Sequence, residues 1–261
     1  MNPIVLTVLI LAVIGLLSGL ILSIAAIVMA VKKDETAEKI EGVLPGANCG
    51  SCGFSGCSGY ASALAKGETT ETTMCSPGGA AVASQIATIL GVDGGAFVQR
   101  RAVVKCRGKN DVTSESYDYE GMHSCAAANR LFFGMGACRF GCIGFGDCVS
   151  VCDKNAISVQ DGVAYIDESL CMGCGKCAKA CPKGLIEVIA GDNKPSVLCM
   201  NHDKGAQTRK VCSAGCIGCG LCMKNCENDA VKVVNFCAHI DAEKCIGCGK
   251  CETVCPQKCI I

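Results

Sequence analysis

The longest apolar stretch of the chain lies at its start. Residues 4–31, "IVLTVLILAVIGLLSGLILSIAAIVMAV", contain no charged side chain, whereas Lys32 and Lys33 follow directly. At 1.5 Å per residue, a helix of roughly 28 residues reaches about 42 Å, which is enough to cross a bilayer with tilt. The positive-inside rule then places the N-terminus outside and everything after Lys32 in the cytoplasm. We therefore expect a single-pass anchor in the cell membrane.

Shorter patterns follow the anchor. "GAAVASQIATIL", residues 79–90, predicts a helix, with Ser76 and Pro77 as its N-cap and first-turn pair and Gly91 as its C-cap. The stretch 107–124 has no clean period and is expected to be irregular. "AISVQDGVAYI" and "AVKVVNFCAHI" alternate apolar and polar positions around a two-residue turn, and each predicts a β-hairpin.

The second half of the chain repeats itself at a constant offset of 74 residues. Nine cysteines of the first copy match cysteines of the second without a gap, which indicates a tandem duplication. The matched pairs are Cys125 with Cys199, Cys138 with Cys212, Cys142 with Cys216, Cys148 with Cys222, Cys152 with Cys226, Cys171 with Cys245, Cys174 with Cys248, Cys177 with Cys251 and Cys181 with Cys255.

The cysteine content changes the interpretation of these repeats. The 261 residues include 26 Cys but only 4% aromatic residues and no Trp. On the reducing side of a membrane, C-x2-C runs indicate metal ligands rather than disulfides. The 24 basic and 24 acidic side chains cancel, so the net charge offers no reason to expect nucleic acid as a partner.

Each copy carries the cysteine run of bacterial ferredoxins. "CMGCGKCAKACP" and "CIGCGKCETVCP" both have the spacing C-x2-C-x2-C-x3-C-P. In such runs three cysteines bind one 4Fe–4S cluster and the fourth reaches the cluster of the neighbouring run. Zinc sites use separated C-x2-C pairs, so iron–sulfur is favoured. Asp153 and Glu227 stand where proline usually follows the fourth cysteine.

Spacing assigns twenty cysteines to five 4Fe–4S clusters. Near the anchor, "NCGSCGFSGC" and a distant fourth cysteine have the spacing C-x2-C-x4-C-x17-C. In the first copy Phe145 replaces the counterpart of Cys219, and Cys138 is expected to supply the missing ligand. The predicted sets are Cys49, Cys52, Cys57 and Cys75; Cys138, Cys142, Cys148 and Cys181; Cys152, Cys171, Cys174 and Cys177; Cys216, Cys219, Cys222 and Cys255; and Cys226, Cys245, Cys248 and Cys251.

Six cysteines remain outside these sets. Cys212 becomes spare, and Cys237 and Cys259 fall on Val163 and Leu185 of the first copy, which favours small core residues. The other three either form an additional metal site or are buried, inert thiols, and we favour the second interpretation. They are Cys106, Cys125 and Cys199.

The expected fold is α+β: a transmembrane helix, a small 4Fe–4S domain and two ferredoxin-like modules with two clusters each. No G-x-G-x-x-G follows a strand and no nucleophile or acid–base constellation stands out, so we expect no catalytic residue and no substrate-converting site. The expected divisions are an anchor at 1–33, a 4Fe–4S domain at 34–92, a connecting segment at 93–137, and modules at 138–198 and 199–261.

Taken together, these motifs resemble the RnfB family, the iron–sulfur subunits of the Rnf complex, an ion-pumping ferredoxin:NAD oxidoreductase. The resemblance covers the whole chain: the anchor, "PGANCGSCGFSGC", "VKCRG", "CRFGCIGFGDCVSVC" and the ferredoxin repeats. It implies a cytoplasmic electron relay that receives electrons from soluble ferredoxin at the duplicated modules. The cluster of Cys49, Cys52, Cys57 and Cys75 would pass them to the other Rnf-type subunits at the membrane.

Two other functions fit the same clusters. The first is an electron-relay component of a different membrane oxidoreductase, such as a hydrogenase; only "PGANCGSCGFSGC" and Phe145 argue against it. The second is a redox-sensing iron–sulfur protein, which predicts an attached DNA-binding or signalling domain. No stretch of this chain is long or basic enough for such a domain.

Overall fold

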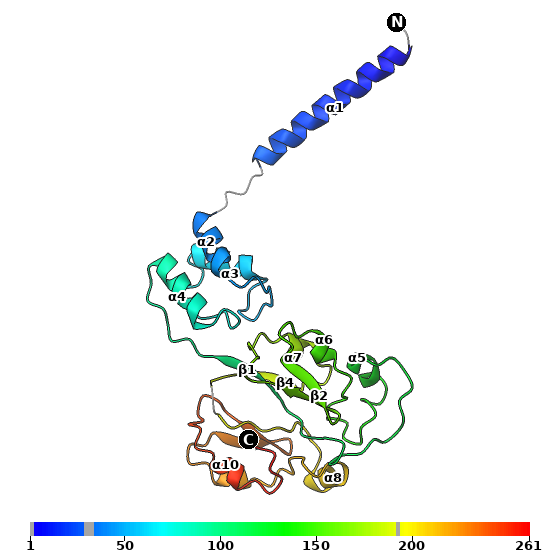
Figure 1. The fold of residues 1–261 in the computed structure, drawn as a ribbon, viewed down its shortest axis with the longest axis vertical. Helices are drawn as coiled ribbons and strands as arrows, with labels where there is room; N and C mark the ends of the chain where they lie inside the picture. The colour runs from blue at the N-terminus through cyan, green and yellow to red at the C-terminus, as the bar shows by residue number, and fades with distance from the viewer. Residues whose placement is uncertain (1–2, 29–33, 192–193) are drawn as a thin grey trace.

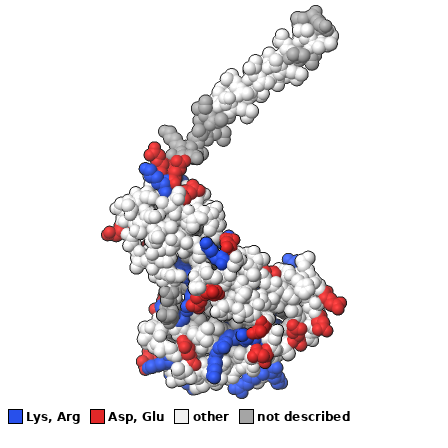
Figure 2. Space-filling view, viewed as in Figure 1, with Lys and Arg blue, Asp and Glu red and all other residues white. Residues whose placement is uncertain are grey.

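The computed structural model describes residues 3–28, 34–191 and 194–261, and these form a helix, a helical domain and two small α+β modules in chain order (Figure 1). Helix α1, Pro3–Val28, has 26 residues and extends away from the rest. Within it, Pro3–Ile24 has a mean hydropathy of 2.9, and Figure 2 shows no charged side chain on it. Such a helix fits a single-pass anchor. Lys32 and Lys33, on which the expected orientation depends, lie outside the described residues.

The helical domain contains three helices, α2 (Glu35–Val43), α3 (Cys57–Ala65) and α4 (Gly79–Leu90). The predicted helix 79–90 and its C-cap Gly91, with φ 66°, are confirmed. The predicted N-cap is wrong, because Gly78 takes that position. Ser76 and Pro77 instead belong to a turn in which the Gly79 amide donates to the Cys75 carbonyl (3.2 Å).

The first module combines three helices with two pairs of strands. The helices are α5 (Cys125–Asn129), α6 (Asp147–Ser150) and α7 (Lys176–Ala180). The hairpin of β2 (Ile157–Gln160) and β3 (Val163–Ile166) is confirmed, and its turn residues Asp161 and Gly162 have φ of 49° and 80°. Both lie in the left-handed region, as a type I′ turn requires. In addition, β1 (Arg100–Val104) pairs antiparallel with β4 (Ile186–Ala190).

The second module repeats the hairpin. Its elements are α8 (Gly205–Val211), α9 (Leu221–Lys224), β5 (Val231–Val234), β6 (Cys237–Ile240) and α10 (Lys250–Thr253). The predicted strands around Asn235 and Phe236 are confirmed, and these residues have φ of 48° and 61°. Residues 105–124, before the first run, form no helix or strand, as expected for 107–124.

The duplication also explains the replaced prolines. Lys176 forms an ion pair with Asp153, and Lys250, its counterpart 74 residues on, forms one with Glu227, each at 2.5 Å. The acidic residue after the fourth cysteine of the first run therefore pairs with a lysine on the helix of the second run. The cores beneath these helices are small and consist largely of cysteines with Val, Ile and Ala. The cysteine side chains are thus part of the core of each module.

Candidate iron–sulfur sites

The first site lies in the helical domain, where loop and helix bring four thiols together. Cys52, Cys57 and Cys75 pack against the core formed around Ile40 and Tyr60. Burial raises the pKa of the Cys75 thiol, and the nearby thiolates of the other three cysteines raise it further. The predicted set of Cys49, Cys52, Cys57 and Cys75 is therefore adjacent in the structure.

A turn and a helix start position the ligand loop. The Asn48 side chain accepts a hydrogen bond from the Cys57 amide at 2.8 Å, which fixes the start of α3. Asn48 itself has φ 45°, a conformation that Asn tolerates better than most residues. Ser51 contacts Ser76 (3.4 Å between hydroxyl oxygens), so the early loop is joined to the segment that carries Cys75.

Three of the four predicted ferredoxin-type sets also surround cavities. Cys177 lies in the short helix α7 and is close to its three partners, whose charges add to the burial that raises its pKa to about 11. Each set lines one cavity: Cys152, Cys171, Cys174 and Cys177 line the first, Cys216, Cys219, Cys222 and Cys255 the second, and Cys226, Cys245, Cys248 and Cys251 the third.

The remaining set differs from the expectation. Cys142, Cys148 and Cys181 share a cavity with Cys125, whereas Cys138 lines another cavity. Helix α5 thus brings Cys125 to this cavity, in the copy where Phe145 stands in place of the counterpart of Cys219. No cysteine spacing signals this, since Cys125 lies well upstream of the run.

Asp147 holds α5 in that position. Its carboxylate accepts hydrogen bonds from the Cys125 amide, the Ala126 amide and the Ser124 hydroxyl, each at 2.9 Å. Burial opposes ionisation of Asp147, but these three donors outweigh it and lower its pKa below 3.8. The counterpart of Asp147 in the second copy is Leu221. These contacts of Asp147 thus occur only in the copy in which Cys125 lines the ferredoxin-type cavity.

Cys237 and Cys259 are buried, at 6% and 1% exposure, in the core of the second module. The Cys237 thiol donates to the Cys199 carbonyl at 3.2 Å, and the Cys259 thiol contacts the Cys255 sulfur at 3.6 Å. The proximity of these two thiols, that of Cys237 first, lowers the pKa of Cys216. Both side chains therefore favour the thiolate form of a neighbouring candidate ligand.

The donor set fits a multi-iron cluster. Thiolates are the ligands of 4Fe–4S clusters, and burial raises the pKa of Cys148 to about 12, so these thiols need a cationic partner to ionise. In residues 3–28, 34–191 and 194–261, no three His, Cys, Asp or Glu side chains converge on a single-ion site. A lone zinc ion, with Zn–S bonds of about 2.3 Å, would require its ligands to converge in this way.

Four families match the chain at these cysteines. They are described as a putative Fe-S cluster (residues 44–77), a 4Fe-4S dicluster domain (137–185) and two 4Fe-4S binding domains (216–230 and 238–261). The fold, the thiol groups and these matches define an iron–sulfur protein with several ferredoxin-like 4Fe–4S domains.

Related proteins identify the family, and each is the component named B of its complex. Over 99% of the chain and 91% of the relative, the chain is 41% identical to that component of a proton-translocating ferredoxin:NAD(+) oxidoreductase from Clostridium ljungdahlii. It is 38% identical to that of an ion-translocating oxidoreductase of Methanosarcina acetivorans (96% and 95% covered). It is 39% identical to that of a Na(+)-translocating ferredoxin:NAD(+) oxidoreductase of Acetobacterium woodii (100% and 78% covered). The chain belongs to this RnfB family, which confirms the resemblance.

Proposed function

We propose that this chain is the membrane-anchored electron relay of an Rnf-type ion-translocating ferredoxin:NAD oxidoreductase. It receives electrons from soluble ferredoxin at the second module and delivers them, at the site of Cys49, to other subunits of the complex. Each 4Fe–4S cluster would supply one-electron transfer, with no conversion of a bound organic substrate in this chain. We keep the expected domain divisions in this proposal, except that β1 and α5 of the connecting segment join the first module.

The ligand sets we propose follow the cavities. They keep the sets expected from spacing, with Cys125 in place of Cys138 in the first module. They are Cys49, Cys52, Cys57 and Cys75; Cys125, Cys142, Cys148 and Cys181; Cys152, Cys171, Cys174 and Cys177; Cys216, Cys219, Cys222 and Cys255; and Cys226, Cys245, Cys248 and Cys251.

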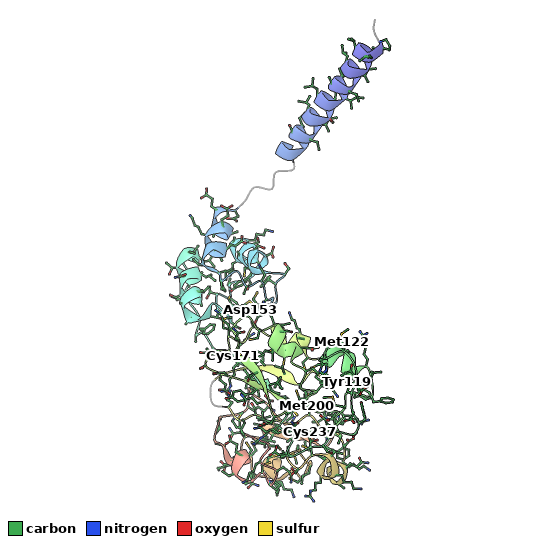
Figure 3. All side chains as sticks on the ribbon, turned by 45° about the vertical axis from the view of Figure 1, so that its right-hand side comes forward. Tyr119, Met122, Asp153, Cys171, Met200 and Cys237 are labelled. Atoms are coloured by element: carbon green, nitrogen blue, oxygen red, sulfur yellow. The ribbon has the colours of Figure 1, made fainter. Side chains whose placement is uncertain are left out.

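A contact between the helical domain and the first module carries the proposal. Lys179 on α7 donates to the Cys49 carbonyl at 3.4 Å. Cys177 lies on the same short helix. Helix α7 therefore connects Cys49, a proposed ligand of the membrane-proximal site, with Cys177, a proposed ligand in the first module. Asp153 and Cys171 lie at the end of the first module that faces the helical domain (Figure 3). The membrane-proximal site is thus continuous with the duplicated modules.

Exposure supports the second module as the place where electrons enter. Cys219 and Cys248 are exposed, whereas the other 24 cysteines are buried or half-buried. Both exposed residues belong to the module farthest from α1 in Figure 1. A soluble donor must bring its own cluster close to the acceptor, and these two sites are the least covered.

We further propose that α1 crosses the cell membrane once, with the N-terminus outside and the cluster domains in the cytoplasm. The uncharged helix and the membrane complexes named for the relatives support this topology. Protease added to right-side-out vesicles should leave the cluster domains intact and should degrade them in inside-out vesicles. Degradation in the first preparation would contradict the orientation.

The relay function is tested by titrating the anaerobically purified full chain in detergent with reduced ferredoxin while cluster bleaching is followed. We expect rapid bleaching with one electron equivalent per 4Fe–4S cluster. Slow bleaching in protein whose iron content matches its clusters would point to another donor and refute ferredoxin as the source.

Two variants test the direction of electron flow through the chain. Cys248→Ser should slow the fast phase, because it removes a ligand at the proposed entrance. Cys52→Ser is the matched control at the opposite end: it should lose the amplitude of one cluster and keep the rate. The reverse pattern would place the entrance at the membrane-proximal site.

A further inference from the structure

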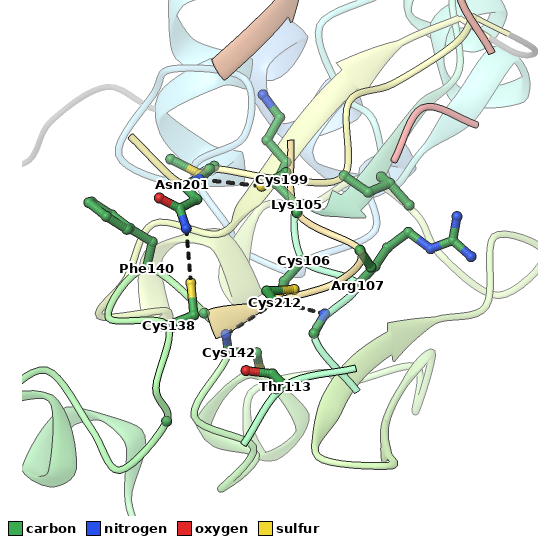
Figure 4. Close-up of a pocket in the computed structure, with 17 residues that line it drawn as sticks. Lys105, Cys106, Arg107, Thr113, Cys138, Phe140, Cys142, Cys199, Asn201 and Cys212 are labelled. Atoms are coloured by element: carbon green, nitrogen blue, oxygen red, sulfur yellow. Dashed lines mark hydrogen bonds between the residues drawn. The ribbon is translucent and has the colours of Figure 1, made fainter. Parts of the chain in front are cut away.

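Four cysteines that the proposed sites leave unused line one cavity where the two modules meet (Figure 4). They come from four separate segments: the stretch after β1, the loop before the first run, the connection between the modules, and the end of α8. The cavity has about 40 Å³ of enclosed space, against about 10 to 30 Å³ for the four ferredoxin-type cavities. The four residues are Cys106, Cys138, Cys199 and Cys212.

Their backbone environment matches that of ferredoxin-type ligands. In the ferredoxin runs, the amide two residues on donates to the sulfur of the first cysteine, as Gly173 does to Cys171 (3.5 Å). Two cysteines of this cavity receive the same bond, from Gly108 to Cys106 and from Asn201 to Cys199, at 3.4 Å each. The amides at the same offset, those of Phe140 and Ala214, oppose the rise in pKa that burial causes at Cys138 and Cys212.

Further donors surround the cavity. Asn201 is only 2% exposed, and its side-chain nitrogen points to the Cys138 sulfur at 3.6 Å, as Figure 4 shows. Lys105 and Arg107 also line the cavity. The charged ends of these two side chains bind Glu187 and the Lys258 carbonyl, so the direct donor is Asn201. A side-chain amide in this position stabilises a thiolate and the negative charge of a cysteine-bound cluster, and an inert core thiol does not need it.

We propose that Cys106, Cys138, Cys199 and Cys212 hold a sixth 4Fe–4S cluster at the junction of the modules. The inference rests on the proposed function, since it assumes that the other thiol groups hold clusters. It replaces the expectation that Cys106 and Cys199 are inert and that Cys212 is spare.

The junction site touches a site of each module. The Cys142 amide donates to the Cys106 sulfur at 3.4 Å, and the Cys216 amide donates to the Cys199 sulfur at 3.2 Å. A proposed ligand of the first module and one of the second are therefore in direct contact with the junction ligands. The sixth cluster would connect two pairs of clusters into one continuous row.

The test is the iron and sulfide content of the anaerobically reconstituted full chain and three variants. Wild type should hold about 24 iron atoms, as expected for six 4Fe–4S clusters. Cys106→Ser, Cys212→Ser and the double variant should each lose about four iron and four sulfide atoms, because both cysteines bind one cluster. Asp161→Asn, which changes an exposed turn residue outside every proposed site, is the control and should lose none.

Three results would overturn the proposal: wild-type iron near 20 atoms, as for five clusters; unchanged iron in the single variants; or twice the single loss in the double variant. If serine at 212 collapses the second module, Cys106→Ser decides alone, since its residue lies outside both ferredoxin runs. The proposed function fails separately: a wild-type chain with full iron content that ferredoxin does not reduce refutes the relay and leaves the sixth site standing.

Discussion

The clamp between Asp147 and α5 makes a quantitative prediction about the first module. Asp147→Asn keeps the acceptor for the Cys125 amide but turns the second oxygen, which serves Ala126 and Ser124, into a donor. Hydrogen bonds to charged groups contribute about 1.5–3 kcal/mol each. Because Asp147 is partly exposed and Ser124 can rotate, we expect a loss of about 2–3 kcal/mol in the free energy of local opening.

Such a loss raises the population of the open form about 30- to 150-fold, since 1.4 kcal/mol is a factor of ten. The assay is hydrogen–deuterium exchange of residues 124–129 in the cluster-loaded chain, read by mass spectrometry. Asp161→Asn is the matched control: it removes an exposed carboxylate paired with Lys109 (3.1 Å) and suits the turn, so exchange in 124–129 should not change. Equal exchange in Asp147→Asn and wild type would refute the clamp.

The pH dependence follows from the same carboxylate. Its pKa in the folded chain lies below the ordinary 3.8, so the folded state stabilises the ionised form. That stabilisation is fully present above the unfolded-state pKa of about 3.9 and is lost as pH falls through the folded pKa. The ratio of exchange between variant and wild type should therefore stay constant from about pH 6 to 8.

Three further predictions concern other parts of the chain. Tyr60→Phe removes a buried hydroxyl that donates to a backbone carbonyl at 2.5 Å, and amide exchange in α3 should rise by the equivalent of about 1–2 kcal/mol; unchanged exchange would contradict it. Asp153→Asn breaks an exposed pair with Lys176, so stability in urea should change by less than about 1 kcal/mol; a larger loss would mean that the pair acts as a structural clamp. Gly218→Ala places a methyl 2.7 Å from a carbonyl oxygen on a residue with φ +63°, so the free energy of unfolding, measured by thermal denaturation, should fall by about 2 kcal/mol. An unchanged stability would mean that the turn shifts freely to admit the methyl.

Local features of the fold were predictable because neighbouring residues determine them. The two hairpins follow from alternation around a two-residue turn, and the end of α4 follows from Gly91. The start of α4 was not, because the turn after Cys75 serves the first site and delays the helix to Gly79.

The allocation of cysteines between sites depends on contacts that spacing does not contain. Cys125 and Cys199 match exactly in the duplication, yet they line different cavities. Asp147 holds Cys125 over the first module, whereas Cys199 faces the junction beside Asn201. Equal positions in a repeat therefore do not imply equal surroundings, because the Asp147 contact with Cys125 has no counterpart in the second copy.

The pairing of β1 with β4 has a consequence for biosynthesis. Arg100 faces Ala190, so the first module cannot close until the chain has been made beyond that strand. At about 5–20 residues per second, the 106 residues that follow Cys106, up to and including Cys212, take about 5 to 20 s to synthesise. During that time the early cysteines leave the ribosome without their partners. Iron and sulfide delivery should therefore begin at the local, membrane-proximal site and finish at the junction between the modules.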